Sequence, residues 1–145
     1  MIVEDYKNII VAVDGSESSK AALQRAIQVA QRNKAVLNIV NVIDTRVWAS
    51  LEARNRDKLE ADAQQFATSL VDSYDDAEKA GIEQIEIITE AGSPRTVITQ
   101  EVAPRIGADL IICGATGVTA AERIFLGSVS EAIVRTAPCD TLVVR

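Results

Sequence analysis

The chain has 145 residues, 48% of them hydrophobic and 25% charged, which is the composition of a single globular domain. Its net charge of −6 disfavours nucleic acid as a partner, because a phosphate backbone attracts basic surfaces. The chain contains no histidine, which excludes Ser-His and Cys-His catalysis as well as histidine-ligated zinc.

Neither the N-terminal segment nor any apolar run indicates a membrane or secretory protein. Residues 1–7 lack the charged and apolar regions of a signal peptide, and no apolar run approaches the ~18 residues that a membrane span requires. The two cysteines, Cys113 and Cys139, are too few for a disulfide framework, so we expect buried, reduced thiols. These features predict a cytoplasmic protein without membrane contact.

The chain opens with a strand and a helix. The run of β-branched residues at 9–13 predicts a strand buried on both faces. Apolar residues then recur at helical spacing from 18 to 32, which predicts an amphipathic helix. Either Ser16 or Ser18 would be the N-cap of this helix.

A second strand and a longer helix follow. The strand is predicted at 35–43 and the helix at about 51–79, with its apolar residues on one face. Gly81 stands where a helix C-cap is expected. The apolar residues between 82 and 88 predict a third strand that is less buried than the first two.

The second half of the chain continues the alternation of strands and helices. Ser93 before Pro94 indicates a helix start, because a capping hydroxyl precedes proline at the first helical position. We expect Pro104 to end or kink this helix. The apolar run at 109–113 predicts the fourth strand.

The last helix and strand complete the pattern. Ser128 and Glu131 match a capping box that opens a helix through about Arg135, and residues 141–145 read as the final strand. Strict alternation of strands and helices predicts one α/β domain over 1–145, an open doubly wound parallel sheet of five strands with helices on both faces.

Two loops carry the residues that would form a ligand site. In sheets of this kind, ligands bind beyond the carboxyl ends of the strands, at the switch in strand order. Asp14 follows the first strand and would either cap the first helix or accept hydrogen bonds from a ribose. Gly114, Gly117 and Gly127 follow the fourth strand; they would either bind phosphate with the next helix N-terminus or only form turns. Arg123 between them would add guanidinium donors.

The spacing of these glycines carries a resemblance. Gly114-x2-Gly117-x9-Gly127-Ser128 has the pattern G-x2-G-x9-G-[ST] of the ATP-binding universal stress proteins, which the chain resembles over essentially its whole length. The segment Ile-Ile-Val-Ala-Val-Asp-Gly-Ser at 9–16 is similar to the family's opening. The resemblance implies a Rossmann-like sheet of the adenine nucleotide alpha hydrolase type, with strand order 3-2-1-4-5.

The resemblance also implies a nucleotide and its contacts. The ligand would be ATP, or ADP or AMP, with Mg²⁺ or Mn²⁺ on the phosphates. Asp14 would bind the ribose with Gly114 beside it. The backbone near Val42 would contact the adenine edge, and Ala12 and Cys113 would line the adenine pocket. The residues that the resemblance implies at the phosphates are Gly117, Gly127, Ser128 and the amide of Val129. The loop itself adds Thr116 and Arg123 as further candidate donors to the phosphates.

Two positions depart from the family pattern. Ala12 stands where family ATP binders often have proline. Ala115 and Thr116 stand where they often have serine followed by a basic residue or histidine. Thr116 can still donate to a phosphate, but one positive charge is lost, so we expect these changes to affect affinity more than the presence of the site.

The implied function is that of a nucleotide-dependent regulatory domain in a stress response. The family commonly forms homodimers through the last strand, which here is Thr141 to Arg145. The chain has no P-loop and no histidine base, so we assign no catalytic residue and expect at most slow ATP hydrolysis. The alternative is a protein-interaction or chaperone-like stress module of the same fold that binds no nucleotide. An adenylating enzyme is a poor match, because the first loop lacks the Ser-Gly-Gly-x-Asp-Ser pattern.

Overall fold

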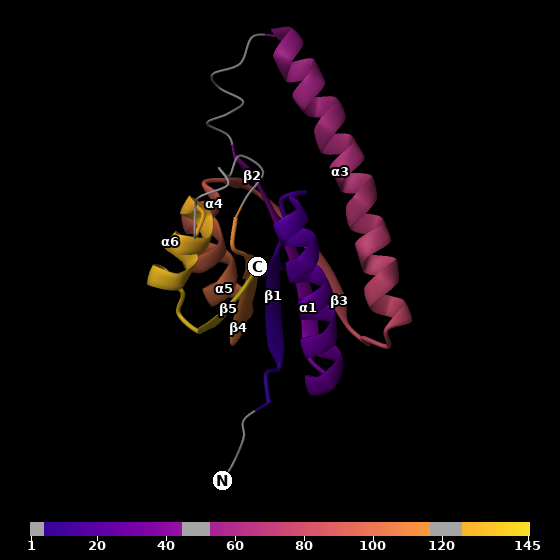
Figure 1. Cartoon of the computed structure of the whole chain (residues 1–145), viewed down its shortest axis with the longest axis vertical. Coiled ribbons are helices and arrows are strands. Elements are labelled where there is room, and N and C mark those ends of the chain that lie inside the picture. Colours follow the sequence, from indigo (N-terminus) through magenta and orange to yellow (C-terminus); the bar gives the residue numbers. More distant parts are fainter. Residues whose placement is uncertain (1–4, 45–52, 117–125) are drawn as a thin grey trace.

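One parallel sheet forms the centre of the molecule (Figure 1). The structure, a computed structural model, describes residues 5–44, 53–116 and 126–145. The strands are β1 (Asn8–Ala12), β2 (Val36–Asp44), β3 (Ile85–Gly92), β4 (Leu110–Gly114) and β5 (Asp140–Val144). Neighbouring strands pair in parallel in the order β3-β2-β1-β4-β5, which confirms the predicted doubly wound fold and its strand order.

Helices cover both faces of the sheet, and each face has its own apolar core (Figure 1). The helical segments are α1 (Glu17–Asn33), α3 (Ala53–Lys79), α4 (Pro94–Thr96), the π-helical η1 (Val97–Val102), α5 (Ala103–Ile106) and α6 (Ser128–Thr136). On one face, Ala26 of α1 and Leu70 of α3 pack against the sheet. On the other, Val102 of η1 and Ile133 of α6 do so. None of the helices in the described ranges is long and apolar enough to cross a bilayer.

The central strands are buried on both faces, as predicted. Ile9 and Ile10 are each 0% exposed, and they lie in different cores because successive side chains of a strand point to opposite faces. The predicted third strand is less buried, because β3 lies at an edge of the sheet and leaves Ile87 39% exposed. This pattern explains why the central strands read as continuous apolar runs.

The end of α3 explains why β3 begins later than the sequence predicts. Gly81 has a φ of +88°, which confirms it as the residue that ends the helix. The Ile82 amide still donates to the Ala77 carbonyl over 3.3 Å, so Ile82 belongs to the helix terminus and its side chain lies in the core. Strand pairing therefore starts at Ile85, opposite Leu37, and not at Ile82.

Pro104 does not end the third helical region. The helix starts after Ser93 as predicted, although no side-chain hydrogen bond caps it. From Val97 to Val102 the backbone adopts π-helical turns, and the Ala103 amide donates to the Ile98 carbonyl five residues back. Proline clashes with the carbonyl four residues before it and has no N–H to donate. The wider π-helical turns accommodate both effects, so the helix continues to Ile106.

Candidate functional site

The predicted site residues of β1, β2 and β4 lie at the carboxyl ends of adjacent strands. β1 lies between β2 and β4, and the strand order reverses at the pair β1 and β4, whose carboxyl ends therefore mark the switch point. Ala12 and Val42 are partly buried against the core cluster that contains Cys113, and Val129 of α6 packs against the same cluster. Four residues predicted to surround a nucleotide therefore share one apolar surface on the α6 side of the sheet.

The first loop presents Asp14 beyond β1. Asp14 is exposed, and its Oδ1 accepts a hydrogen bond from the Ser16 amide over 2.9 Å. Ser16, not Asp14 or Ser18, caps α1, because its hydroxyl accepts from the Ser19 amide over 3.1 Å. Ser16 is thus confirmed as the N-cap, and of the two roles left open for Asp14 the capping role is excluded. The Asp14 carboxylate remains at the surface, where a polar ligand can reach it.

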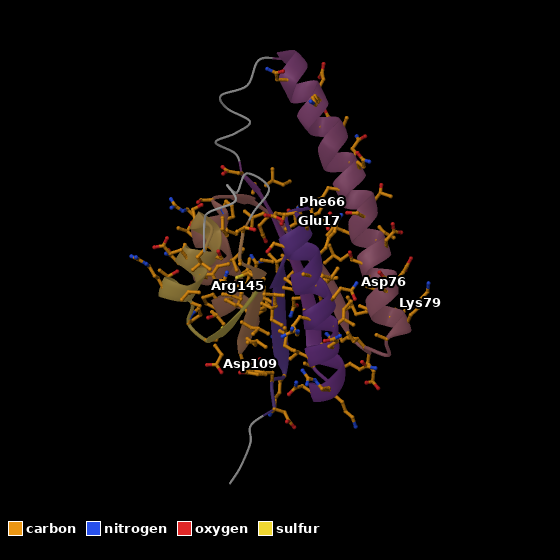
Figure 2. The ribbon with its side chains drawn as sticks, in the orientation of Figure 1. Glu17, Phe66, Asp76, Lys79, Asp109 and Arg145 are labelled. Atoms are coloured by element: carbon orange, nitrogen blue, oxygen red, sulfur yellow. The ribbon has the colours of Figure 1, made fainter. Side chains whose placement is uncertain are left out.

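The long helix α3 reaches this loop. Gly15 has a φ of +86°, and a Cβ added to it would lie 3.4 Å from the Phe66 ring. Figure 2 labels Phe66 and Glu17 near the same end of the sheet, with Asp109 at the opposite end. Asp109 accepts hydrogen bonds from the Lys7 and Asn8 amides, over 2.8 and 3.1 Å, and so ties the amino-terminal ends of β1 and β4 together.

Gly114 allows β4 and α1 to approach closely. A Cβ added to Gly114 would lie 2.3 Å from the Ser18 hydroxyl oxygen, 2.6 Å from its carbonyl carbon and 2.7 Å from its carbonyl oxygen. No side chain fits at such distances. Packing against the first turn of α1 therefore requires glycine at this position, whether or not a ligand binds there.

The backbone after β4 is held by three different elements. The Ala115 amide donates to the Val144 carbonyl of β5 over 2.8 Å, and the Thr116 amide donates to the Ser18 hydroxyl over 3.3 Å. The Ala115 carbonyl accepts from the Gly127 amide over 2.7 Å. This last bond places the start of α6 directly beside the end of β4.

Gly127, not Ser128, is the N-cap of α6. The Glu131 amide donates to the Gly127 carbonyl over 2.9 Å, and Ser128 is already the first helical residue. The predicted capping box is wrong, since Glu131 pairs with Arg135 over 2.8 Å and the Gly127 backbone is fixed by its bond to Ala115.

The first turn of α6 has the properties of an anion site. Amides of a first helical turn have no acceptor within the helix, and the helix N-terminus carries a partial positive charge. The Gly127 amide already donates to Ala115, so the amides that remain to bind an anion are those of Ser128 and Val129, with Ser130 next. Gly117 and Arg123, which were also predicted here, lie outside the described residues.

Burial keeps the Cys113 thiol protonated at neutral pH. Cys113 is 3% exposed, and desolvation raises its pKa to about 11. The pKa of Cys139 is also raised, first by burial and then by Asp109 and Asp140, although that thiol is only half-buried. Both cysteines are free, and the prediction of full burial holds for Cys113 alone.

We therefore expect Cys139 to react with iodoacetamide well before Cys113 in the native protein. A pKa of about 11 leaves Cys113 on the order of 100-fold less thiolate than an ordinary cysteine has at neutral pH. Timed alkylation followed by peptide mass spectrometry measures the two rates, and denatured protein provides the control in which they should converge. Equal rates in the native protein would contradict the burial of Cys113.

Three residues that shape the site were missed from the sequence. Ser18, Ser19 and Ser130 all bond to backbone of the two loops, through contacts from residues far apart in the chain or across a helix turn. Ser18 was considered only as a cap, and Ser130 only as a spacer in the capping box. The signal available was a serine in the first turn after each loop, which by itself is common at helix starts.

Comparison with known proteins relates the whole chain to one family. The model of the universal stress protein family matches residues 5–145. A protein of Staphylococcus haemolyticus (strain JCSC1435) that is named for this family is 47% identical over 141 residues, covering 97% of this chain and 85% of the relative. A Staphylococcus aureus (strain USA300) protein named in the same way is 48% identical, covering 97% and 84%.

Solved structures of similar proteins agree in fold. Universal stress protein UspA from Lactobacillus plantarum matches with a TM-score of 0.85 and 26% identity, over 99% of this chain and 100% of that one. A universal stress protein in complex with cAMP matches with a TM-score of 0.71 and 28% identity, over 98% of both chains.

Proposed function

We propose that this chain, which belongs to the universal stress protein family, binds ATP and acts as a nucleotide-dependent regulatory domain in a stress response. The observation that carries the proposal is the Gly127–Ala115 hydrogen bond of 2.7 Å. It brings the amides of the α6 first turn, which have no acceptor within the helix, beside the ends of β1 and β4, where Asp14 is exposed.

Each part of an adenine nucleotide has a candidate partner here. Asp14 would accept hydrogen bonds from the ribose hydroxyls, and the backbone of β2 near Val42 would contact the adenine edge. Ala12 and Cys113 would contribute apolar surface beneath the base. The proposed phosphate contacts are Thr116, Gly117, Arg123, Ser128 and Val129, with Gly127 positioning the last two.

A divalent cation, Mg²⁺ or Mn²⁺, would come to the site on the phosphates. Among the described residues, no three carboxylates or cysteines gather in a way that would hold a metal ion. Phosphate oxygens are hard ligands that Mg²⁺ prefers, and Mg²⁺ bound by phosphates commonly needs few protein ligands. The cation would screen the phosphate charge, which the chain's net charge of −6 otherwise repels.

The strand β5 supports the proposal of a homodimer. It is an edge strand, and Leu142 and Val143 in it are only half-buried. Pairing with a second copy would satisfy the free backbone groups of this edge and cover those side chains. The Ala115 amide donates to the Val144 carbonyl of β5, so a single hydrogen bond connects the loop of the proposed nucleotide site to the strand of the proposed dimer interface. We also propose a cytoplasmic location, where the free thiols would stay reduced.

A cyclic nucleotide is the second candidate ligand, because one structural relative was solved with cAMP. Both ligands share adenine and ribose and differ in their phosphates. A cyclic monophosphate has no ribose 3′ hydroxyl to donate to Asp14 and no triphosphate chain to extend along α6. Comparing affinities for MgATP and cAMP therefore separates the two candidates.

Native mass spectrometry of freshly purified protein tests the proposed function. We expect about one ATP or ADP per chain and a mass of two chains. An empty protein whose melting temperature also fails to rise with millimolar MgATP would overturn the proposal and favour the interaction module without nucleotide. Stabilisation by cAMP but not by MgATP would instead identify the second candidate.

A further inference from the structure

Two buried serines occupy equivalent places in the two loops of the site. Ser19 follows the N-cap of α1, Ser16, by three residues, and Ser130 follows the N-cap of α6, Gly127, by three residues. Ser19 is 5% exposed and Ser130 is 4% exposed, so water does not compete for either hydroxyl. Few polar side chains in the described part of the chain are as buried as these.

Both hydroxyls join a strand end to the N-cap of the next helix. The Ser19 hydroxyl donates to the Ser16 carbonyl over 3.0 Å and accepts from the Asp14 amide over 3.3 Å. The Ser130 oxygen lies 2.9 Å from the Ala115 carbonyl oxygen and 3.0 Å from the Gly127 carbonyl oxygen, and its one proton is shared between them. The first serine thus holds Asp14, and the second holds the first turn of α6.

Neither hydroxyl is needed to satisfy a buried carbonyl. The Ser16 carbonyl also accepts from the Lys20 amide over 3.1 Å. The Ala115 and Gly127 carbonyls also accept from the Gly127 and Glu131 amides, over 2.7 and 2.9 Å. Replacing either serine with alanine would therefore leave each of these carbonyls with a donor. In Ser19→Ala the Asp14 amide would also lose the Ser19 hydroxyl as its acceptor, but Asp14 is exposed and water can replace that acceptor, so we expect little loss of stability in either variant.

We propose that Ser19 and Ser130 are positioning residues of the nucleotide site, each serving a different part of the ligand. Ser19 fixes the position of the Asp14 backbone, and so the position of the carboxylate that would face the ribose. Ser130 sets the distance between Ala115 and the α6 amides that face the phosphates. The inference rests on the proposed function and extends it. It assigns part of the ribose affinity to the Ser19 hydroxyl and part of the phosphate affinity to the Ser130 hydroxyl, although neither hydroxyl would touch the nucleotide.

The division predicts effects that differ between ligands. Ser19→Ala should weaken the binding of MgATP and of adenosine by the same factor, about fivefold, because both ligands carry the ribose. Ser130→Ala should weaken the affinity for MgATP by about tenfold and leave the affinity for adenosine within about twofold of wild type, because adenosine has no phosphate. A loss of general stability would weaken the binding of both ligands in both variants and could not produce the ligand difference expected for Ser130→Ala. For Ser19→Ala, the positioning role requires that the equal loss of affinity occurs without a matching fall in melting temperature.

Dissociation constants for MgATP and adenosine, measured by NMR titration of wild type and variants, test the proposal. Ser73→Ala is the matched control, because the Ser73 hydroxyl also donates to a helix carbonyl, that of Ser69, but lies in α3. Its affinities should equal those of wild type. Ser130→Thr keeps a hydroxyl and should restore most of the MgATP affinity. Melting temperatures should fall by no more than roughly 3 °C in the alanine variants.

The outcomes separate this inference from the proposed function. If wild type binds neither MgATP nor adenosine, both are overturned. If wild type binds both ligands but Ser130→Ala changes their affinities equally, or changes neither, only the positioning role is overturned. A fall in MgATP affinity that Ser130→Thr does not restore would likewise point to packing and count against the hydroxyl.

Discussion

Replacing Gly127 with aspartate is expected to weaken ATP binding by at least about 100-fold while leaving the fold intact. Gly127 has φ −69° and ψ 165°, which any residue adopts without strain. Aspartate is also among the best N-cap residues, so α6 should be as stable as before or more so. Its carboxylate would accept hydrogen bonds from the same first-turn amides that we assign to the phosphates, and it would repel the anion directly.

Calorimetric titration with MgATP, together with thermal unfolding of the free protein, measures both halves of this expectation. Gly127→Asn is the matched control, because asparagine caps a helix equally well and has nearly the same shape without the charge. Its loss of affinity should be clearly smaller. An aspartate variant that binds MgATP as tightly as wild type would show that the phosphates do not lie at the start of α6.

Replacing Gly114 with alanine is expected to destabilise the protein by about 3 kcal/mol. The added methyl group would lie 2.6 and 2.7 Å from the carbonyl carbon and oxygen of Ser18. A side-chain rotation of Ser18 can move its hydroxyl away but cannot move these backbone atoms. The first turn of α1 would have to shift away from β4, and the Thr116 amide would lose its bond to the Ser18 hydroxyl.

Thermal unfolding should detect this change as a fall in melting temperature of roughly 10 °C. Gly107→Asn provides the comparison, because a Cβ at Gly107 has no atom within 4 Å and its φ of +67° is one that asparagine tolerates. That variant should cost less than about 1 kcal/mol. A Gly114→Ala protein as stable as Gly107→Asn would contradict the close approach of β4 and α1.

These two expectations assign different tasks to glycines of one motif. Gly114 is required by the packing of a strand against a helix, which holds in the absence of any ligand. Gly127 is the N-cap of α6 and adds no side chain of its own to the first turn. A motif match alone therefore does not demonstrate a nucleotide site, because part of the pattern is explained by the fold.

Much of the fold was predictable from local patterns. Continuous apolar runs identified β1 and β4, because strands buried on both faces have no polar side. Helical spacing and the terminal signals of Ser16 and Gly81 located α1 and the end of α3. The strand order came from resemblance to a family, since alternation by itself predicts a parallel sheet but not the sequence of its strands.

Predictions failed where a backbone hydrogen bond that the local residue pattern does not reveal decides between alternatives. Ser128 resembles an N-cap, but the bond between Gly127 and Ala115, twelve residues apart, moves the helix start. Of the two effects expected of Pro104, only the ending of the helix is wrong, because the π-helical turns of η1 before it let the helix continue to Ile106. Ile82 is β-branched and was assigned to a strand, but its amide bonds to the Ala77 carbonyl at the end of α3 and its side chain lies in the core there.

By itself the sequence determined the alternating α/β architecture, the family and the residues that are candidates for a nucleotide site, because apolar period, helix signals and glycine spacing are properties of neighbouring residues. Only the tertiary structure decided how the two loops are held. The close contact of Gly114 with Ser18, the joining of Ala115 to β5 and α6, and the two buried serines all depend on distances between segments far apart in the chain. Such distances follow from packing, which no local pattern encodes.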